Sequence, residues 1–541
     1  MLMKSLFFFF LLLSIASASS LVAIKVVPID GEDPIVTAKR IADDNPEHIE
    51  YVEPAGGLQR YFIYKLKSTS ATRYVHENSG HLIEESSVQT PLVRNKRNFF
   101  NDPYSKLQWH HNLMQMEDIW SQGIDGKGVG VAVVDDGLDI HHDEFVQRYN
   151  AQGSHDFNLH QPEPIPMLAD DMHGTRCAGE IAAQADNNKC GVGIAYNSHI
   201  AGIRILSGPV SDVLEASALT YASDVNHIYS NSWGPPDDGE TVEAPGPLTQ
   251  LALKEGTTNG RDGLGSIFVF ASGNGGMNGD NCAYDGYVSS IYTIGIGAID
   301  RDLNAPNYQE WCTAQMAVAF SSNKRDYIYT SDIRNGCTDK HGGTSAAAPI
   351  AAGVIALVLQ VRPDLSWRDI QWLIATTSQP FQSDHIKWQM NGNGLLFHPL
   401  HGFGLIDAKA MVEVARYWIP VAEQERYEFD CIYPGPQSVC KYDVNIPLSK
   451  DFVVEHTIAQ VDIRPTRYRG DIELELISAH ETVSQILTRR YWDRSTEWLV
   501  QWPAMTVFNW GENDPNGAWT VTVKGGTLDS CKLIIYGHHR R

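Results

Sequence analysis

Basic residues are scarce in this 541-residue sequence: 42 lysines and arginines stand against 65 aspartates and glutamates, and the net charge is −23. The phosphates of a nucleic acid would be repelled by this balance, which argues against a nucleic-acid partner. Asn-x-Ser/Thr sequons are absent, and the composition has neither a collagen-like nor a disordered bias. A chain of this length is expected to be globular, with two or three domains.

A long apolar run is also missing. A bilayer requires about 20 consecutive apolar residues, and the apolar run over residues 6–15 is shorter than that. Lys4 precedes this run and Ala16-Ser17-Ala18 follows it, which is typical of a signal peptide over residues 1–18. We expect no transmembrane segment in this chain, and a mature protein that is secreted or lumenal.

The rest of the chain divides into three kinds of segment. Residues 19–97 lack cysteine and mix short β-like runs with polar stretches. Over residues 98–418, apolar runs such as VGVAVVDD and SIFVFASG alternate with small-residue helices, which predicts a mostly parallel sheet covered on both faces. Over residues 419–541, alternating strands such as DIELELIS and AWTVTVKG predict a β-sandwich. Eight cysteines indicate disulfides, but their pairing does not follow from the sequence.

Three segments of the middle region carry an acid, a base and a hydroxyl. Asp135 ends the buried run VGVAVVD, His173 opens HGTRCAGEIAA, and Ser345 lies in HGGTSAAAPIAAG. Asp135 should stand at the carboxyl edge of the sheet, where functional groups gather, and Ser345 at a helix N-terminus. A serine needs a base to take its proton, and the base needs an acid to fix its tautomer. Asn274, in FASGNGG, offers an amide for an oxyanion.

Each residue by itself has a plain structural alternative. A lone aspartate at a strand end, or a serine at a helix N-terminus, is usually structural. Here each lies beside glycines, in the chain order Asp, His, Ser that is typical of the subtilisin arrangement. We therefore interpret Asp135, His173 and Ser345 as a catalytic set.

With these motifs the chain resembles the subtilisin-like proprotein convertases, the kexin and furin family. The resemblance covers nearly everything after the signal peptide and includes VVDDG, HGTRCAGE, NSWGPPDDG, GLGSIFVFASGNGG, DGYVSSIYTIGI, GGTSAAAP, RGDIELEL and NWGENDPNGAW. It implies an α/β subtilisin-like domain with a doubly wound, mostly parallel sheet over 98–418. A small α+β inhibitory and chaperone prodomain would precede it at 19–97, and an all-β P domain (sandwich or jelly roll) would follow at 419–541. It also implies a serine endoprotease of the secretory pathway, in the Golgi or secretory vesicles, or secreted.

The family binds basic side chains of its substrates in a cleft lined with acids. Arginine offers a fixed fork of donors that carboxylates accept in pairs. The resemblance implies Asp237 and Asp285 for the residue before the cut, Asp136 and Asp170 for the second residue back, Glu215 and Glu243 for the fourth, and Tyr287 in the same substrate-binding set. Individually, a surface carboxylate is usually just solvated.

The stretch VRNKRNFF presents Arg97, Lys96 and Arg94 at the first, second and fourth places before a bond. That arrangement suits an acidic cleft, so we expect self-cleavage after Arg97 that releases residues 19–97 as the chain's own inhibitor. The alternative is a linker cut by another protease. His76 and His81 could release this inhibitor on acidification, because histidine titrates near neutrality.

The resemblance also implies bound Ca²⁺, which prefers oxygen ligands. One implied set is Asp102, Glu144 and Asn187 with the carbonyls of Gln184, Lys189 and Gly191, and another is Asp237, Asp280 and Glu310. Glu144 stands where the family usually has aspartate, a modest change in reach. A third site keeps Asp156, but Gln161 and Glu163 replace aspartates there, so we expect that site to be eroded.

The family's cysteine pattern implies Cys190–Cys337 and Cys282–Cys312 pairs and a Cys431–Cys440 pair within the P domain. Cys177 and Cys531 would be left free, with Cys177 a buried thiol rather than a nucleophile. Arg469-Gly470-Asp471 could suggest integrin binding, but it is expected to open a strand. Two rival functions remain: a broad-specificity subtilisin, and a catalytically silent binding partner or chaperone.

Overall fold

The computed structural model describes residues 100–381, 386–432 and 435–540, and four strands of the N-terminal region. The chain forms two compact units, Met1–Arg97 and Asn98–Arg541. The first unit contains an antiparallel sheet in the order β1-β2-β4-β3. Its strands are β1 (Phe9–Phe10), which lies within the predicted signal peptide, β2 (Leu21–Lys25), β3 (Ile49–Pro54) and β4 (Tyr61–Leu66). His76, His81, Arg94, Lys96 and Arg97 lie outside the described residues.

The second unit is built on a seven-stranded sheet in the order β11-β10-β9-β8-β5-β7-β6, and every pairing in it is parallel. Its strands are β5 (Gly130–Asp135), β6 (His155–Asp156), β7 (His199–Arg204), β8 (Ile228–Asn231), β9 (Ile267–Ala271), β10 (Thr293–Ile299) and β11 (Gln315–Phe320). The strand order reverses around β5, which β7 and β8 flank. Open α/β sheets bind ligands at the carboxyl ends of strands beside such a reversal.

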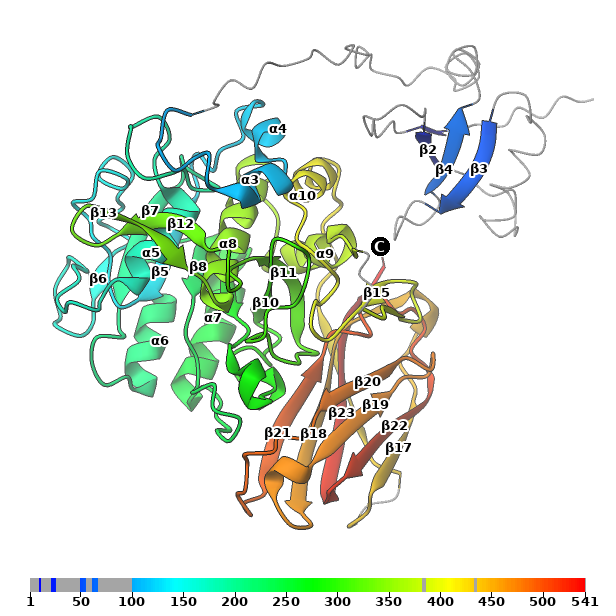
Figure 1. Ribbon diagram of the computed structural model, residues 1–541. Coiled ribbons are helices and arrows are strands. Elements are labelled where there is room, and N and C mark those ends of the chain that lie inside the picture. Colours follow the sequence, from blue (N-terminus) through cyan, green and yellow to red (C-terminus); the bar gives the residue numbers. More distant parts are fainter. Residues whose placement is uncertain are drawn as a thin grey trace, which may run out of the picture. The chain divides into compact units, whose positions relative to one another are not determined.

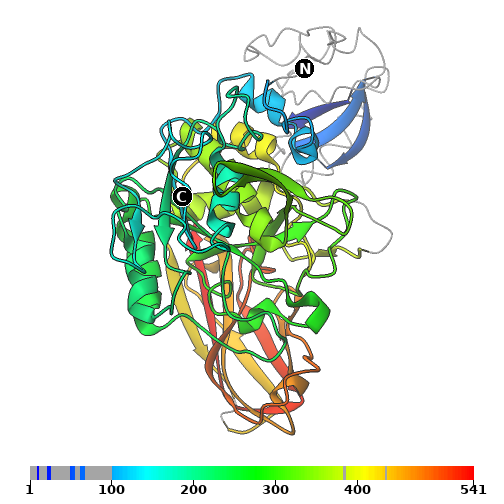
Figure 2. The ribbon, with the colours of Figure 1, turned by 60° about the vertical axis from the view of Figure 1, so that its left-hand side comes forward.

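Helices cover both faces of this sheet (Figures 1 and 2). They are α3 (Trp109–Leu113), α4 (Met116–Trp120), α5 (His173–Ala182), α6 (Asp212–Thr220), α7 (Pro247–Gly263), α8 (Thr344–Val361), α9 (Trp367–Thr377) and α10 (Ala408–Ala415). On β5, Val131 and Val133 pack in the core with α5 and α8, whereas Ala132 and Val134 pack with α6 and α7. This alternation explains why the strand is apolar throughout.

Short hairpins complete this layer: β12 (Ile328–Asp332) with β13 (Gly336–His341), and β14 (Gln389–Met390) with β15 (Leu396–Phe397). Among the described residues, α8 alone has the length and hydropathy of a membrane span, and 83% of that stretch is buried inside the protein. Its many alanines allow the close packing of a central core helix.

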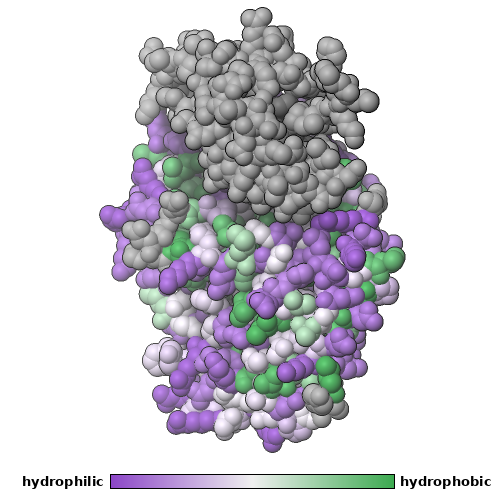
Figure 3. Space-filling view, turned by 90° about the vertical axis from the view of Figure 1, so that its right-hand side faces the viewer, coloured by the Kyte–Doolittle hydropathy of each residue, from purple (hydrophilic) through white to green (hydrophobic). Residues whose placement is uncertain are grey.

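The C-terminal part is a β-sandwich of two antiparallel four-stranded sheets, β16-β23-β18-β21 and β17-β22-β19-β20. Its strands are β16 (Glu425–Asp430), β17 (Val439–Val444), β18 (Phe452–Pro465), β19 (Glu473–Ile477), β20 (Val483–Leu487), β21 (Leu499–Thr506), β22 (Gly517–Lys524) and β23 (Gly526–His539). Buried and exposed side chains alternate strictly along β17, as expected where one face meets the core. Figure 3 shows one face of the molecule, on which hydrophilic side chains are mixed with scattered hydrophobic groups.

The Arg469-Gly470-Asp471 segment forms a short 3-10 turn ahead of β19, and does not begin the strand as the sequence analysis expected. Gly470 is buried, and Arg469 Nε donates to Asp493 at 2.7 Å. Because the arginine is held within the protein, the segment has a structural role.

The sandwich joins the α/β layer through a buried polar cluster around Glu455 of β18. Arg368 Nε and Trp372 Nε1 of α9 donate to this carboxylate at 3.0 and 2.9 Å, and His538 Nδ1 of β23 lies 2.9 Å from it. Burial opposes ionisation, but the contacts with His538 and Arg368 hold the pKa of Glu455 below its ordinary value. The two domains therefore share one satisfied ionic cluster.

Candidate active site

Asp135 and His173 meet where β5 ends and α5 begins. Asp135 is 1% exposed, and both of its carboxylate oxygens lie within reach of His173 Nδ1, at 2.9 and 3.0 Å. Burial alone would lower the pKa of His173, but the Asp135 charge outweighs it and raises that pKa well above the usual value. Because the carboxylate can only accept, the neutral imidazole carries its proton on Nδ1, and Nε2 is the nitrogen that can act as a base in that form.

The start of α5 is held against β5 by Asp136. Its two carboxylate oxygens accept the backbone N–H groups of His173 and Gly174 at 2.9 and 2.7 Å. A side chain at Gly174 would place its Cβ 2.3 Å from Gly137 O and 2.8 Å from Asp135 Cβ. Only glycine allows this approach. Burial and the neighbouring Asp135 raise the pKa of Asp136 to about 7.

Ser345 and Asn274 lie at the N-terminus of α8. Asn274 Oδ1 accepts from the backbone N–H and the hydroxyl of Thr344, at 2.8 and 3.1 Å. The amide Nδ2 of Asn274 donates one N–H to Asp237 Oδ2 at a long 3.5 Å, and its second N–H remains available to a ligand. Gly343 precedes the helix at φ +76, a conformation that side chains rarely adopt. Ser345 is half-buried beside these groups.

Cys177 packs between the base and the serine. Its Sγ lies 3.9 Å from His173 Nδ1 and 3.6 Å from the carbonyl oxygen of Ser345, which places the two segments side by side. Among the described residues no hydrogen bond joins the Ser345 hydroxyl to His173, and such bonds often tighten only when substrate binds. Burial raises the pKa of Cys177 to about 11, so it remains a neutral thiol.

The sequence analysis missed His341, whose Nε2 lies 3.7 Å from Cys177 Sγ. The imidazoles of His173 and His341 and the thiol of Cys177 form a group whose ligand atoms lie within 4.8 Å of one another. The sequence did contain a feature that could have identified His341, since this residue opens the same HGGTS motif that carries Ser345. Without the fold, nothing indicated that this histidine faces the site.

Several of the predicted substrate-binding residues are brought together by Tyr287. Its hydroxyl donates to Glu215 at 2.8 Å, and its backbone N–H donates to Asp285 at 2.7 Å. Glu243 is exposed and forms a parallel backbone bridge with Asp285. Burial raises the pKa of Asp285 to about 7 and also raises that of Glu215. Thr249, which was not predicted, donates its hydroxyl to Glu215 at 3.1 Å.

Two neighbouring aspartates before α5 have different surroundings. Asp170, a predicted binding residue, is exposed. Asp171 is buried and accepts from Arg204 Nη2 at 3.0 Å. Arg204 Nη1 also donates to Asp156 at 2.9 Å. No local pattern marks Arg204, because its partners lie far from it in the sequence, Asp156 in β6 and Asp171 just before α5.

The first predicted calcium set has buried oxygens with no partner in the protein. Asn187 contacts both acids of the set, through its backbone N–H to Asp102 at 3.0 Å and its amide to Glu144 at 2.8 Å. The other Glu144 oxygen and the side-chain oxygen of Gln184 are buried without a hydrogen bond. Burial raises the pKa of Glu144 to about 8. These oxygens fit a divalent cation.

The second set, Asp237, Asp280 and Glu310, lines one pocket together with Asp285. Burial and the charges of Asp280 and Asp237 raise the pKa of Glu310 well above its usual value. Three converging carboxylates fit a divalent cation, whose charge would offset their repulsion. The third set does not fit: Asp156 is already engaged by Arg204 and by the backbone N–H groups of Asn158 and Leu159.

Three disulfides are formed, Cys190–Cys337, Cys282–Cys312 and Cys431–Cys440. Cys177 and Cys531 are free and buried. Cys190–Cys337 ties the loop of the first predicted calcium set to β13, just before the segment that carries His341 and Ser345.

Comparison with known proteins identifies the families of both domains of the second unit. Residues 126–404 match the subtilase family, and residues 454–535 match the proprotein convertase P-domain. A solved structure titled as a serine protease of Aeromonas sobria superposes with a TM-score of 0.73 at 20% identity, covering 84% of this chain and 99% of that one. At that identity the likeness concerns the fold.

Curated relatives are more similar in sequence. Kexin of Saccharomyces cerevisiae is 44% identical over 81% of this chain, which spans 56% of that protein. The dibasic-processing endoprotease of Schizosaccharomyces pombe is 39% identical over 93% of this chain and 77% of its own length. Proprotein convertase subtilisin/kexin type 4 of Rattus norvegicus is 39% identical over 83% of this chain and 70% of its own length.

Proposed function

Because this chain belongs to the subtilase family, in its kexin-like branch with a P domain, we propose that it is a serine endoprotease that cleaves proproteins after paired or multiple basic residues. The observation that carries the proposal is the Asp135–His173 contact of 2.9 Å at the start of α5, beside Ser345 and Asn274. Such an arrangement favours acyl transfer over a silent binding role.

In this mechanism the Ser345 hydroxyl attacks the carbonyl carbon of the scissile peptide bond while His173 Nε2 takes its proton. Asp135 stabilises the resulting imidazolium through Nδ1. His173 then gives the proton to the departing amine as the C–N bond breaks, which leaves an acyl ester on Ser345. A water molecule, deprotonated by the same histidine, hydrolyses this ester.

The oxyanion of each tetrahedral intermediate would be held by two donors. One is the amide NH₂ of Asn274, whose carbonyl is already fixed by Thr344. The other is the backbone N–H of Ser345 at the N-terminus of α8, where the helix dipole favours negative charge. Both groups would be in place before the charge develops, so they would need no rearrangement during the reaction.

Recognition of basic side chains would rest on the carboxylates around the cleft. Asp285 and Asp237 would bind the residue before the cut, Asp136 and Asp170 the second residue back, and Glu215 and Glu243 the fourth, with Tyr287 orienting Glu215. The partly desolvated carboxylates favour a bidentate guanidinium over a neutral side chain. These carboxylates favour this specificity over that of a generalist subtilisin.

Calcium would be held by Asp102, Glu144, Gln184, Asn187, Lys189 and Gly191 in one site and by Asp237, Asp280 and Glu310 in another. When bound, the ion offsets the charge of buried carboxylates. Residues 19–97 would act as inhibitor until self-cleavage after Arg97. The enzyme would work in the secretory pathway, on proproteins that carry basic cleavage sites.

We expect the purified chain to hydrolyse a fluorogenic peptide that ends in Arg-Asn-Lys-Arg and to leave a matched peptide ending in Phe intact. A calcium chelator should abolish this activity, and added Ca²⁺ should restore it. Equal cleavage of both peptides would mean a generalist protease, and cleavage of neither by a chain already cut after Arg97 would support a binding role.

Replacing Asn274 by alanine should lower kcat by about 10²–10³-fold with little change in KM, because one of two oxyanion donors is lost. Steady-state kinetics on the basic peptide measure this effect. Asn259→Ala, at an exposed position on α7, is the matched control and should behave as the wild type. A change in KM alone for Asn274→Ala would remove Asn274 from the oxyanion site.

A further inference from the structure

One side chain of the P domain crosses into the α/β layer at the carboxylate pocket. Arg490 follows β20, and its side chain is 0% exposed. Its backbone N–H donates to Gly470 O at 2.9 Å, and its Nη2 donates to Asp493 at 2.6 Å. The P domain therefore holds both the backbone and the guanidinium of Arg490. The ring of Tyr284 lies beneath the guanidinium, with Cζ 3.7 Å from the ring centroid.

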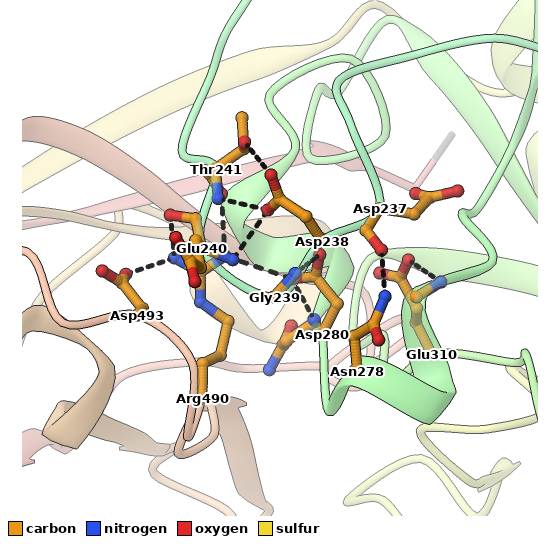
Figure 4. Close-up of polar contacts among 12 residues, drawn as sticks. Asp237, Asp238, Gly239, Glu240, Thr241, Asn278, Asp280, Glu310, Arg490 and Asp493 are labelled. Atoms are coloured by element: carbon orange, nitrogen blue, oxygen red, sulfur yellow. Dashed lines mark hydrogen bonds and ion pairs between the residues drawn. The ribbon is translucent and has the colours of Figure 1, made fainter.

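The far end of Arg490 contacts the loop that carries a predicted specificity residue (Figure 4). Nη1 donates to Thr241 O at 2.7 Å, and Nη2 donates to Glu240 O at 3.2 Å. This loop begins at Asp237, whose carboxylate accepts the backbone N–H of Asn274 at 2.9 Å. Arg490 therefore holds the 237–241 loop at its C-terminal end, Thr241. The N-terminal end of the same loop, Asp237, contacts Asn274, the proposed oxyanion residue.

Arg490 also orients one carboxylate of the pocket directly. Its Nη1 donates to Asp280 Oδ1 at 3.1 Å, while Asp280 Oδ2 accepts from Gly239 N at 2.8 Å. Asp280 is thus held between the P-domain arginine and the same loop. Asp280, Asp237 and Glu310 line one pocket, and Arg490 brings positive charge to it from the P domain.

We propose that Arg490 is a positioning residue for substrate and calcium recognition: it sets the place of Asp280 and of the 237–241 loop, so that the P domain helps to shape the site for the basic side chain before the cut. The inference rests on the proposed function. A guanidinium suits the role because its fork donates in two directions at fixed geometry, which a lysine ammonium does not reproduce.

The test compares Arg490→Met and Arg490→Lys with two controls. Arg489→Met removes the neighbouring arginine, which is half exposed and pairs with Asp471. Glu455→Gln weakens another cluster that joins the two domains, whose hydrogen-bond partners Arg368, Trp372, Gln424 and His538 do not belong to the carboxylate pocket. Three quantities are measured: KM and kcat for the basic peptide, and the Ca²⁺ concentration at half of the calcium-induced rise in Tm, called the Ca²⁺ midpoint below.

Both Arg490 variants should raise KM by about tenfold, the cost of losing hydrogen bonds to a charged group, with a smaller change in kcat. Arg490→Lys, which keeps the positive charge beside Asp280 but not the fork of donors, should also raise the Ca²⁺ midpoint by about tenfold. Arg489→Met should match the wild type. Glu455→Gln should lower Tm and leave KM and the Ca²⁺ midpoint within about twofold, since Glu455 shares no hydrogen-bond partner with Asp280. Arg490→Lys keeps the buried charge, and so it is decisive if Arg490→Met fails to fold.

The inference is overturned if Arg490→Lys resembles Glu455→Gln, with a lower Tm but an unchanged KM and Ca²⁺ midpoint, because Arg490 would then serve docking alone. Failure of the proposed function looks different. In that case the wild type itself leaves the basic peptide intact, while the Ca²⁺ midpoint still reports whether Arg490 positions Asp280.

Discussion

Ser345→Ala is expected to leave the chain uncut after Arg97 and to lower kcat on the basic peptide about a millionfold. The hydroxyl oxygen is the atom that forms the acyl bond, and no neighbouring group can replace it. Cys177 is the nearest candidate, but its buried thiol has a pKa raised to about 11. Mass spectrometry of the purified chain and burst-phase kinetics together measure the effect.

Ser121→Ala is the control for this variant, because Ser121 is exposed at the end of α4. It should mature and hydrolyse peptide as the wild type does. If Ser345→Ala is still cut after Arg97 when made in cells, another protease performs the cleavage, and residues 19–97 are a linker processed from outside. Retained peptide hydrolysis would instead remove Ser345 from the mechanism.

Asp135→Asn should lower kcat about 10⁴-fold, because an amide can donate to Nδ1 and so favours the tautomer in which Nε2 carries the proton. The pH profile provides a second readout. Asp135 raises the pKa of His173, so removing its charge should lower that pKa. The imidazole of His173 then stays neutral to lower pH. The acid limb of the residual kcat/KM profile is therefore expected to shift to lower pH.

The matched control for Asp135→Asn is Asp118→Asn. Asp118 is about half exposed and pairs with Lys409 on the surface, where such pairs contribute little. Its activity and pH profile should match the wild type. An acid limb that stays in place in Asp135→Asn would mean that another group sets the pKa of His173.

Local sequence was enough to place the chemical groups on their elements. Asp135 ends a strand and His173 and Ser345 begin helices, as the apolar runs and glycines predicted. The parallel sheet, the antiparallel sandwich and the family were also predicted correctly. The turn at Arg469–Asp471 was wrongly predicted to open a strand, because the burial of Gly470 against the backbone of the 490–493 loop was not visible locally.

Only the tertiary structure decided which groups support these residues. Thr344 fixes the amide of Asn274, Arg204 joins Asp156 to Asp171, and Arg490 reaches Thr241 from 249 positions away in the sequence. Periodicity and turn residues report on neighbours within a few positions, because they reflect backbone geometry. Contacts across domains depend instead on strand order and on how the sandwich packs against the α/β layer. The residues around a single arginine in a loop therefore do not predict its distant partner.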